Sequence, residues 1–381
     1  MYKYPFNKPF IHGRELMNIA ESVASGKISG DGIFTKKCHE LFKFKYNINN
    51  IYLTTSCTDA LEIAAISLDI KEGDEIIMPS YTFVSSANAF VLRGAKIIFI
   101  DSQKDHPNID GLQIENKITD KTKAILVVHY AGIACDMEII MEISRKYNIP
   151  VVEDAAQAID SKYQNKYLGT IGSYGAYSFH ETKNISCGEG GAIIVNNIDC
   201  VGKVEIIREK GTNRSAFLRG EYDKYTWVGL GSSFLPSDIL AAYLYAQLEN
   251  IEQIQNKRKT LWKRYNELLE PFSKELNFET PNIPPYATNN AHMYYIVMKN
   301  EKCRGELIEY LKTKDILSVS HYVPLHSSPF FKNYSKEKEN YLPNCDKFSE
   351  GLLRLPLYHD LNIEDVEYIC AKIITGLLKN R

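Results

Sequence analysis

Short apolar runs alternate with helix-like segments between residues 74 and 196, and this alternation restricts the chain to few folds. Segments 85–95 and 136–148 carry apolar residues at the spacing of one helix face. The other runs have the length of strands, and they cover residues 75–79, 96–101, 124–130, 150–155, 175–180 and 191–196. A strand–helix–strand order is typical of a mostly parallel sheet with helices on its faces. We therefore predict an α/β fold built around such a sheet.

A chain of 381 residues is longer than a single hydrophobic core usually supports. We therefore predict that the rest of the chain forms a second, smaller unit. Residues 237–270 predict one long helix, apolar at first and amphipathic later. After a proline-rich stretch, a mixed pattern predicts strands over 292–298 and 317–323 and helices over 304–314 and from about 363. We predict a large domain over residues 1–245 and a smaller α+β domain over 246–381, joined by the long helix.

Charge and cysteine content exclude several classes of function. Lysine and arginine number 45 against 47 acidic residues, so no basic excess indicates nucleic acid or a membrane surface as partner. The apolar stretches are too short to span a bilayer, and the N-terminal residues lack the apolar core of a signal peptide. The eight cysteines show no zinc-ligand spacing. We expect a cytoplasmic protein with reduced thiols and no metal site.

Several of the expected strands end in polar residues: Asp101, His129, Asp154 and Ser178. Ligands of open α/β sheets bind outside the carboxyl ends of the strands, so these positions are candidates for a binding site. Asp154 is followed by Gln157, one helical turn further along. Such a carboxylate either caps a helix, pairs with a cation or holds the ring nitrogen of a pyridinium cofactor.

Ser56, Cys57 and Thr58 stand directly before a helix-like segment. Free backbone N–H groups and the helix dipole attract an anion at such a place. The same residues also fit an ordinary N-terminal cap, because Ser56 and Asp59 have the spacing of a capping box.

Phe83 and Lys183 each follow a strand as well. The phenylalanine either packs in the core or covers a flat ring. The lysine is either solvated or a desolvated amine beside the glycine-rich residues 188–191. An anion cradle, a ring cover, a carboxylate and an amine at four strand ends together match pyridoxal 5′-phosphate (PLP), which we therefore predict as the cofactor.

Six segments then resemble the DegT/DnrJ/EryC1/StrS family of PLP-dependent sugar aminotransferases: TTSCTDALEIAA, MPSYTFVSSANAFVLRGAKIIF, VHYAGIACDM, VVEDAAQ, SFHETKNISCGEGGA and IIREKGTNRSAFLRGEYDKYTW. The resemblance extends from residue 25 to residue 361. It implies fold type I of the PLP enzymes, with a large domain around a mostly parallel sheet and a smaller α+β C-terminal domain.

By position, the resemblance implies that Lys183 is the cofactor-bound lysine and that Asp154 holds the ring nitrogen. The other implied cofactor contacts are Gln157 at the ring hydroxyl, Phe83 on the ring face, and Ser56, Cys57, Thr58 and Ser178 at the phosphate. Many members have G-x-N-Y-R-M-S-D where this chain has GSSFLPSD, so the asparagine that contacts the phosphate across the dimer is Ser233 here.

The resemblance further implies a homodimer that transfers the amino group of L-glutamate to a keto sugar nucleotide. The segments are most similar to the members that convert dTDP-4-dehydro-6-deoxy-D-glucose into dTDP-4-amino-4,6-dideoxy-D-galactose for lipopolysaccharide and related surface antigens. The opposite stereochemistry at C4, another keto sugar and a non-catalytic sensor remain alternatives. Relatives that have histidine in place of the lysine are dehydratases, and position 183 is lysine here despite the nearby His180.

Two groups of residues are candidates for substrate contacts. Lys210, Arg214, Arg219 and Lys224 would suit a diphosphate, or they belong to a solvated charged loop. Tyr322 and His326 either approach the substrate from the smaller domain or lie in a buried turn held by Pro324.

Overall fold

A computed structural model describes residues 2–334 and 341–379 of the chain. A seven-stranded sheet is formed in the order β1 (Ile51–Thr54), β9 (Gly191–Val195), β8 (Tyr174–Ser178), β5 (Val151–Asp154), β4 (Thr122–Val128), β2 (Glu75–Pro79) and β3 (Lys96–Ile100). β9 runs antiparallel to both of its neighbours, while the other pairs are parallel. The predicted mostly parallel sheet is therefore confirmed.

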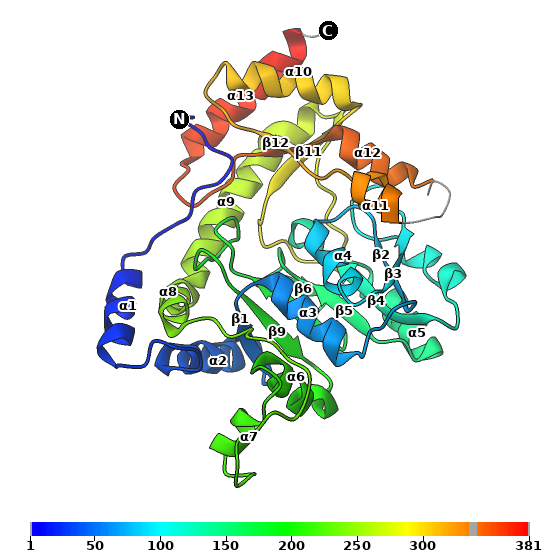
Figure 1. Cartoon of the computed structure of the whole chain (residues 1–381). Helices are drawn as coiled ribbons and strands as arrows, with labels where there is room; N and C mark the ends of the chain where they lie inside the picture. The colour runs from blue at the N-terminus through cyan, green and yellow to red at the C-terminus, as the bar shows by residue number, and fades with distance from the viewer. Residues whose placement is uncertain (1, 335–340, 380–381) are drawn as a thin grey trace.

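Helices cover both faces of this sheet, and the central strands are buried throughout, with successive residues in the cores on opposite faces (Figure 1). On one face α2 (Ile33–Tyr46), α5 (Met137–Tyr147) and α8 (Asp238–Glu249) pack against residues such as Ile125 and Val127. On the other face α3 (Cys57–Ser67), α4 (Val84–Val91) and α6 (Val201–Arg208) pack against alternate residues such as Leu126. We call this three-layered part the large lobe.

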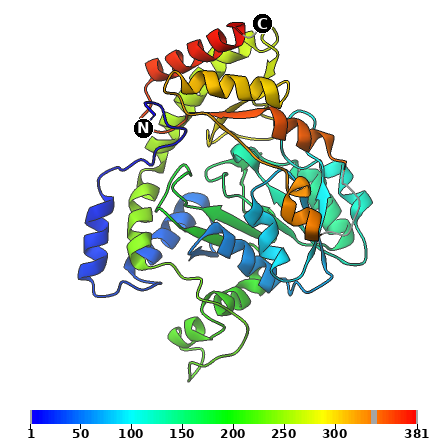
Figure 2. The ribbon, with the colours of Figure 1, turned by 45° about the horizontal axis from the view of Figure 1, so that its top comes forward.

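A second sheet has the order β10 (Phe278–Glu279), β11 (Tyr294–Met298), β13 (Leu352–Leu355) and β12 (Val319–Ser320), and all its pairs are antiparallel. Its core is shared with α9 (Ile251–Leu269), α10 (Glu301–Lys312) and α13 (Ile363–Lys379). We call this part the small lobe. It lies above the large lobe, and the N-terminal segment of the chain runs beside it (Figure 2).

The N-terminal residues join the small lobe through the backbone. Tyr4 N donates to Asp315 O and Tyr4 O accepts from Leu317 N, while Phe6 O accepts from Leu357 N. The division at residue 245 stays a prediction, and we propose that residues 4–6 be counted with the small lobe.

The single helix predicted over 237–270 is wrong, because α8 and α9 are separate helices. Asn250 between them has φ −107° and ψ 11°, outside the helical region. Its side-chain amide donates to Ala246 O at 2.8 Å and so competes for a backbone acceptor. The predicted strand over 317–323 is also shorter than expected, with only Val319 and Ser320 in β12.

Asp238, the first residue of α8, holds the N-terminal helices onto the large lobe. It is fully buried, and its carboxylate accepts from Phe34 N at 3.2 Å and from Thr35 N at 2.9 Å. The hydroxyls of Thr35 and Ser22, the latter in α1 (Glu15–Ala24), donate to the same carboxylate at 2.9 and 3.2 Å. One side chain thus binds α1 and α2 to α8.

We expect Asp238→Ala to lower the free energy of unfolding by about 3 kcal/mol, because several buried donors lose an ionised acceptor. Urea unfolding checks this, with Asp120→Ala as the control at an exposed aspartate. Equal midpoints for the two variants would contradict the role given to Asp238.

Candidate active site

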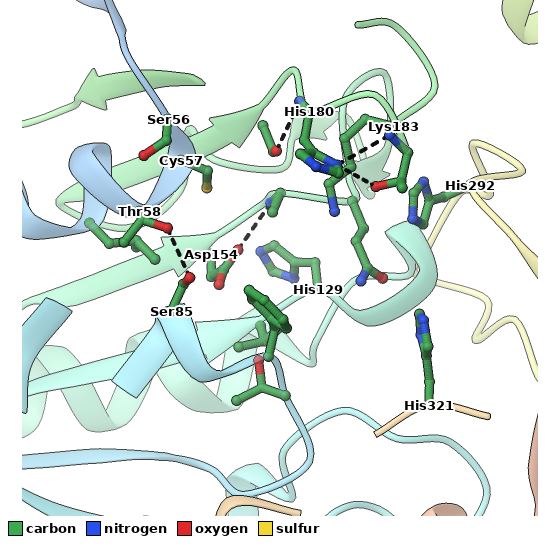
Figure 3. A pocket seen from close by; sticks show the side chains of 18 of the residues that line it. Ser56, Cys57, Thr58, Ser85, His129, Asp154, His180, Lys183, His292 and His321 are labelled. Carbon is green, nitrogen blue, oxygen red and sulfur yellow. Dashed lines mark hydrogen bonds between the residues drawn. The ribbon is translucent and has the colours of Figure 1, made fainter. Parts of the chain in front are cut away.

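A cavity of about 450 Å³ opens at the carboxyl ends of β4, β5 and β8 (Figure 3). Both lobes contribute to its wall. Ten residues singled out in the sequence line it: Ser56, Cys57, Thr58, Phe83, His129, Asp154, Gln157, Ser178, Lys183 and Tyr322. Segments more than 250 residues apart in sequence therefore meet where the sheet predicts a ligand.

The N-terminus of α3 forms one wall of the cavity. Ser56 is the N-cap, and its Oγ accepts from Asp59 N at 3.0 Å, so the expected cap is present. The first N–H groups of a helix have no partner within the helix, so those of Cys57 and Thr58 are left available to an anion, while Asp59 N is taken by the cap. The same residues can therefore cap the helix and bind an anion.

Gly191 explains part of the glycine-rich motif. A Cβ on this residue would lie 2.4 Å from Cys57 N, so only glycine lets β9 approach the start of α3 this closely. Ser178, the last residue of β8, pairs with Gly191 in the sheet and is itself buried. The motif therefore brings the Ser178 hydroxyl and the α3 N-terminus to the same end of the cavity.

Asp154, the last residue of β5, is oriented by two hydrogen bonds. Its Oδ2 accepts from Ser86 Oγ at 2.6 Å and its Oδ1 accepts from Ala156 N at 3.1 Å. The side chain is buried but reaches the cavity wall. A carboxylate held in this way can accept a further hydrogen bond from a protonated ring nitrogen.

His129 lies beside Asp154 and is also fixed. Its Nε2 donates to Glu153 Oε2 at 2.9 Å, and its Nδ1 accepts from Cys135 N at 3.2 Å. Glu153 in turn accepts from three backbone N–H groups, those of Gly169, Ile171 and Gly172. The sequence marked His129 only as a polar strand end, without assigning it to the cofactor.

Lys183 precedes Asn184, whose side chain is bound to α9 and to the segment before β11. Asn184 Nδ2 donates to Gln255 Oε1 of α9 and to Asn290 O, each at 2.8 Å. Asn184 Oδ1 pairs with His292 Nδ1, also at 2.8 Å. Because its neighbour is held from three directions, the Lys183 side chain projects into the cavity (Figure 3).

Burial lowers the pKa of the Lys183 amine, and the nearby positive charge of Arg354 acts in the same direction. Cys57 and Asp154 oppose the shift but do not cancel it. A lysine with a lowered pKa is more often neutral, which is the form that acts as a nucleophile or a base.

Phe83 is 56% exposed, so the alternative of a core phenylalanine is wrong. Its ring lies on the cavity wall, 6.1 Å between centroids from the Tyr322 ring. Gln157 connects the lobes, since its Oε1 accepts from Ala131 N at 2.6 Å and its Nε2 donates to Tyr322 Oη at 3.2 Å. Burial raises the pKa of Tyr322 to about 12, which keeps the phenol neutral.

Six of the predicted contacts lie outside this cavity. Lys210 and Arg214 pair with Glu209, and Arg219 pairs with Glu205 and Glu221. Lys224 is exposed, and Ser233 forms a backbone bridge with Glu209. His326 is turned away from the cavity, with its Nδ1 2.7 Å from Ser80 Oγ and its Nε2 3.4 Å from Asp346. Asp101, another polar strand end, accepts from the backbone N–H of Asn344 and Cys345 at 3.1 and 2.8 Å.

Sequence reasoning missed four cavity residues of the small lobe: Phe6, His292, His321 and Arg354. The one signal for Arg354 was an arginine within the apolar run LLRLPL, a place where arginine is rarely buried without a reason.

Comparison with known proteins adds the family. A model of the DegT/DnrJ/EryC1/StrS aminotransferase family matches residues 9–374. The chain belongs to this family. It is also 34% identical over 383 aligned positions to the uncharacterised protein MJ1066 of Methanocaldococcus jannaschii, covering 99% of this chain and 98% of that protein.

Two solved structures are similar over nearly their whole length. Spr1654 from Streptococcus pneumoniae in its PLP form is 26% identical with a TM-score of 0.90, covering 99% of both chains. DesV from S. venezuelae is 26% identical with a TM-score of 0.89, again covering 99% of both chains. The fold is thus fold type I, and the chain is a PLP-dependent aminotransferase that takes an amino donor and a sugar.

The cavity fits PLP. It presents an anion-binding helix N-terminus, an exposed aromatic face, an oriented carboxylate and a lysine of lowered pKa. Among residues 2–334 and 341–379 no group of three or more potential metal ligands is found. No helix in that part of the chain is long and apolar enough to cross a membrane.

The lowered pKa of Lys183 predicts a pH effect on the stability of the cofactor-free protein. In the unfolded chain the amine titrates near 10.4, above its folded pKa. Between the two values the unfolded chain holds one proton more, so the free energy of unfolding rises with pH by at most about 1.4 kcal/mol per unit. Below the folded pKa this contribution is flat.

Lys183→Met removes that titration, so the wild type should gain stability relative to the variant as pH rises toward 10. Urea unfolding at a series of pH values measures the difference. Lys166→Met, at an exposed lysine, serves as the control and should give a constant offset. A constant offset for Lys183→Met as well would mean that its pKa is ordinary.

Proposed function

We propose that the enzyme transfers the amino group of L-glutamate to C4 of dTDP-4-dehydro-6-deoxy-D-glucose, giving dTDP-4-amino-4,6-dideoxy-D-galactose and 2-oxoglutarate. The observation that carries the proposal is the Lys183 amine of lowered pKa, which shares one cavity with the oriented carboxylate of Asp154. The choice of sugar rests on the motif similarity alone. We further propose that the reaction is cytoplasmic and supplies a surface polysaccharide.

When bound, PLP supplies an aldehyde that receives the amino group and a ring that withdraws electrons. We assign Asp154 to the ring nitrogen, Phe83 to the ring face and Gln157 to the ring hydroxyl. Ser56, Cys57, Thr58 and Ser178 are assigned to the phosphate group. The neutral Lys183 amine removes the proton from Cα of glutamate, and in the second half of the cycle the protonated amine delivers a proton to C4 of the sugar. One amine serves both steps because its pKa is lowered toward neutrality.

We propose a homodimer in which the segment 210–233, named the arm, reaches the partner subunit's cavity. Apolar side chains on the arm support this, since Trp227 is 80% exposed and Leu230 is also exposed. Leu16 and Met17 of α1 are exposed apolar side chains as well. Ser233, Lys210, Arg214, Arg219 and Lys224 are then assigned to the phosphates of cofactor and sugar nucleotide across the interface.

The dimer predicts a mass of twice the 43.5 kDa of the chain. Light scattering coupled to size exclusion measures it. Trp227→Glu should shift the protein toward the monomer, because a charge replaces an apolar contact. The surface substitution Lys166→Glu is the control. A monomer at micromolar wild-type protein would contradict the proposal.

Two alternatives use the same site. The amine added to the opposite face of C4 would give dTDP-4-amino-4,6-dideoxy-D-glucose, and another keto sugar nucleotide would give a different amino sugar. A non-catalytic sensor is disfavoured by the family and by the intact lysine. The dehydratase branch is disfavoured by the lysine at position 183.

Proton NMR of the product from L-glutamate and dTDP-4-dehydro-6-deoxy-D-glucose tests the reaction. An axial amine gives a small coupling between H3 and H4, and this is the expected result. A large coupling indicates the equatorial amine and the alternative stereochemistry. Lys183→Met should give no product while Lys166→Met gives the wild-type product. If the wild type leaves this sugar unchanged, the assigned substrate is wrong.

A further inference from the structure

A second pocket of about 290 Å³ lies in the large lobe, at the far end of α3 from the active-site cavity. The cavity is lined by Cys57 at the start of α3, and this pocket by Ile66 near its end. Because a helix rises by about 1.5 Å per residue, these two residues lie about 14 Å apart along the helix axis. α6, which lies beside α3, and the arm form the other walls (Figure 1). We call it the rear pocket, and its lining residues lie within 66–71, 203–207 and 228–230, together with Arg93.

Two turns of the chain bring Lys71 and Arg93 to the same wall of the rear pocket. Each turn leads into one of the neighbouring parallel strands β2 and β3. Gly94 O accepts from Gly73 N at 3.2 Å, which joins the two turns. Gly94 has φ +86°, and a Cβ there would lie 2.8 Å from Glu72 Cα, so only glycine lets the turns approach this closely. The backbone therefore fixes where the two cations lie.

The guanidinium of Arg93 has none of the usual partners of a surface arginine. Its Nε is buried and lacks a hydrogen-bond partner among the described residues. A solvated arginine keeps its N–H groups in water, and an arginine that caps a helix donates to the last carbonyls. Arg93 stands two residues after the end of α4, yet its Nε makes neither contact. A buried donor without a partner is costly, so an acceptor supplied by a ligand is the expected compensation.

The wall of the rear pocket carries more positive than negative charge. Lys71, Arg93 and Lys203 supply three cations, and among the described residues that line the pocket Asp69 is the one carboxylate. Lys203 Nζ lies 2.6 Å from Asp69 Oδ2, so these two charges compensate each other. The charges of Lys71 and Arg93 remain, and an anion of charge −2 would match both.

The rest of the wall is apolar, with six aliphatic side chains from α3, the turn after it, α6 and the arm. Ile70 and Ile207 are each 1% exposed and close the floor. Ile206 is half-buried, while Leu230 of the arm is exposed. A ligand with an apolar body would remove this surface from water, which favours its binding.

We propose that the rear pocket binds a small phosphate monoester, with the phosphate between Lys71 and Arg93 and an apolar body against Ile206 and Leu230. A phosphate monoester carries a charge of about −1.5 to −2 near pH 7, whereas a carboxylate carries only −1. A guanidinium also matches two phosphate oxygens with two parallel N–H groups.

The size of the rear pocket restricts the ligand further. Pockets for drug-sized ligands have volumes of about 300–1,000 Å³, and the rear pocket lies at the lower end of this range. It therefore suits one ring with one phosphate, and a sugar nucleotide with its two phosphates, base and two sugars is too large.

A ligand in the rear pocket contacts the base of the arm. Val228 N and Gly229 N donate to Gly211 O at 2.8 and 3.0 Å, so the two ends of the arm are joined beside the pocket. Trp227 Nε1 donates to Gly229 O at 2.6 Å. Because a ligand that binds only the folded state stabilises it, occupancy of the pocket should stabilise the arm.

Calorimetry with phenyl phosphate tests the proposal. The PLP-loaded enzyme is used, so that the phosphate site of the cofactor is filled, and no substrate is needed. Arg93→Gln should weaken binding by at least about tenfold, the loss of a charge-assisted hydrogen bond, and Arg93→Lys should recover part of the loss. Arg145→Gln, at an exposed arginine of α5, is the matched control and should bind as the wild type does.

Two further comparisons test the two halves of the ligand. Ile206→Ala should weaken phenyl phosphate by at least about fourfold, the effect of one methylene group, while inorganic phosphate stays within about twofold. Benzoate, which has the same ring and a single charge, should bind the wild type at least about tenfold more weakly than phenyl phosphate. Benzoate that binds as tightly as phenyl phosphate would assign the pocket to a carboxylate and overturn the proposal.

Wild-type affinity in Arg93→Gln would place the probe outside the rear pocket and overturn the proposal, as would a wild type that binds no phenyl phosphate at millimolar concentration. Lys71→Gln guards against a purely structural effect at Arg93, because Lys71 is exposed and its loss leaves the packing intact. This variant should keep the thermal unfolding midpoint of the ligand-free wild type and lose most of the rise that phenyl phosphate causes. A full rise in Lys71→Gln would contradict the phosphate position.

Discussion

The position of Lys183 depends on how Asn184 is held. The Asn184 amide nitrogen donates to Gln255 of α9 and to Asn290 O, and the amide oxygen contacts His292 Nδ1. These partners come from the helix that connects the lobes and from the segment that leads into β11. The reactive amine is therefore positioned by the small lobe, although the residue itself follows a strand of the large lobe. Loss of this contact would free the amine to reach solvent, where its pKa would return to the ordinary value.

The sequence predicted six of the seven strands of the large sheet, because their signals are local. Apolar runs of strand length recur between helical patterns, and the polar residue after each run lies at the carboxyl edge by the geometry of parallel strands. Asp154 and Ser178 were found in this way. β1 was not predicted, because IYLT is a very short run at a sheet edge and looks like many loop segments. Asn250 was also missed, since its effect on the helix comes from one side-chain hydrogen bond that periodicity does not encode.

Arg354 and His321 could not be found from local patterns, because they stand out only by buried side-chain nitrogens that have no hydrogen-bond partner in the described part of the chain. An arginine in LLRLPL predicts only that something nearby compensates its charge. Which groups surround it depends on the packing of β11 and β13 against segments that are distant in sequence. His326 illustrates the reverse case. Its sequence neighbourhood resembled that of a substrate contact, yet Ser80 and Asp346 occupy its ring nitrogens.

The two lobes supply different groups to the cavity, and their architecture explains the difference. The carboxyl edge of the parallel sheet brings together the groups that suit an aromatic phosphate ligand, and their spacing is set by strand register and by the close approach at Gly191. The antiparallel sheet and the segment after β12 contribute a cation, Arg354, and the rings of Tyr295 and His321, and polar atoms of all three have no hydrogen-bond partner among the described residues. A residue such as Arg354 can therefore be exchanged without disturbing the strands that hold the cofactor groups. The groups that suit the cofactor and the groups that face the substrate lie on separate sheets. Substrate recognition in this chain can therefore change while the chemistry at Lys183 is kept.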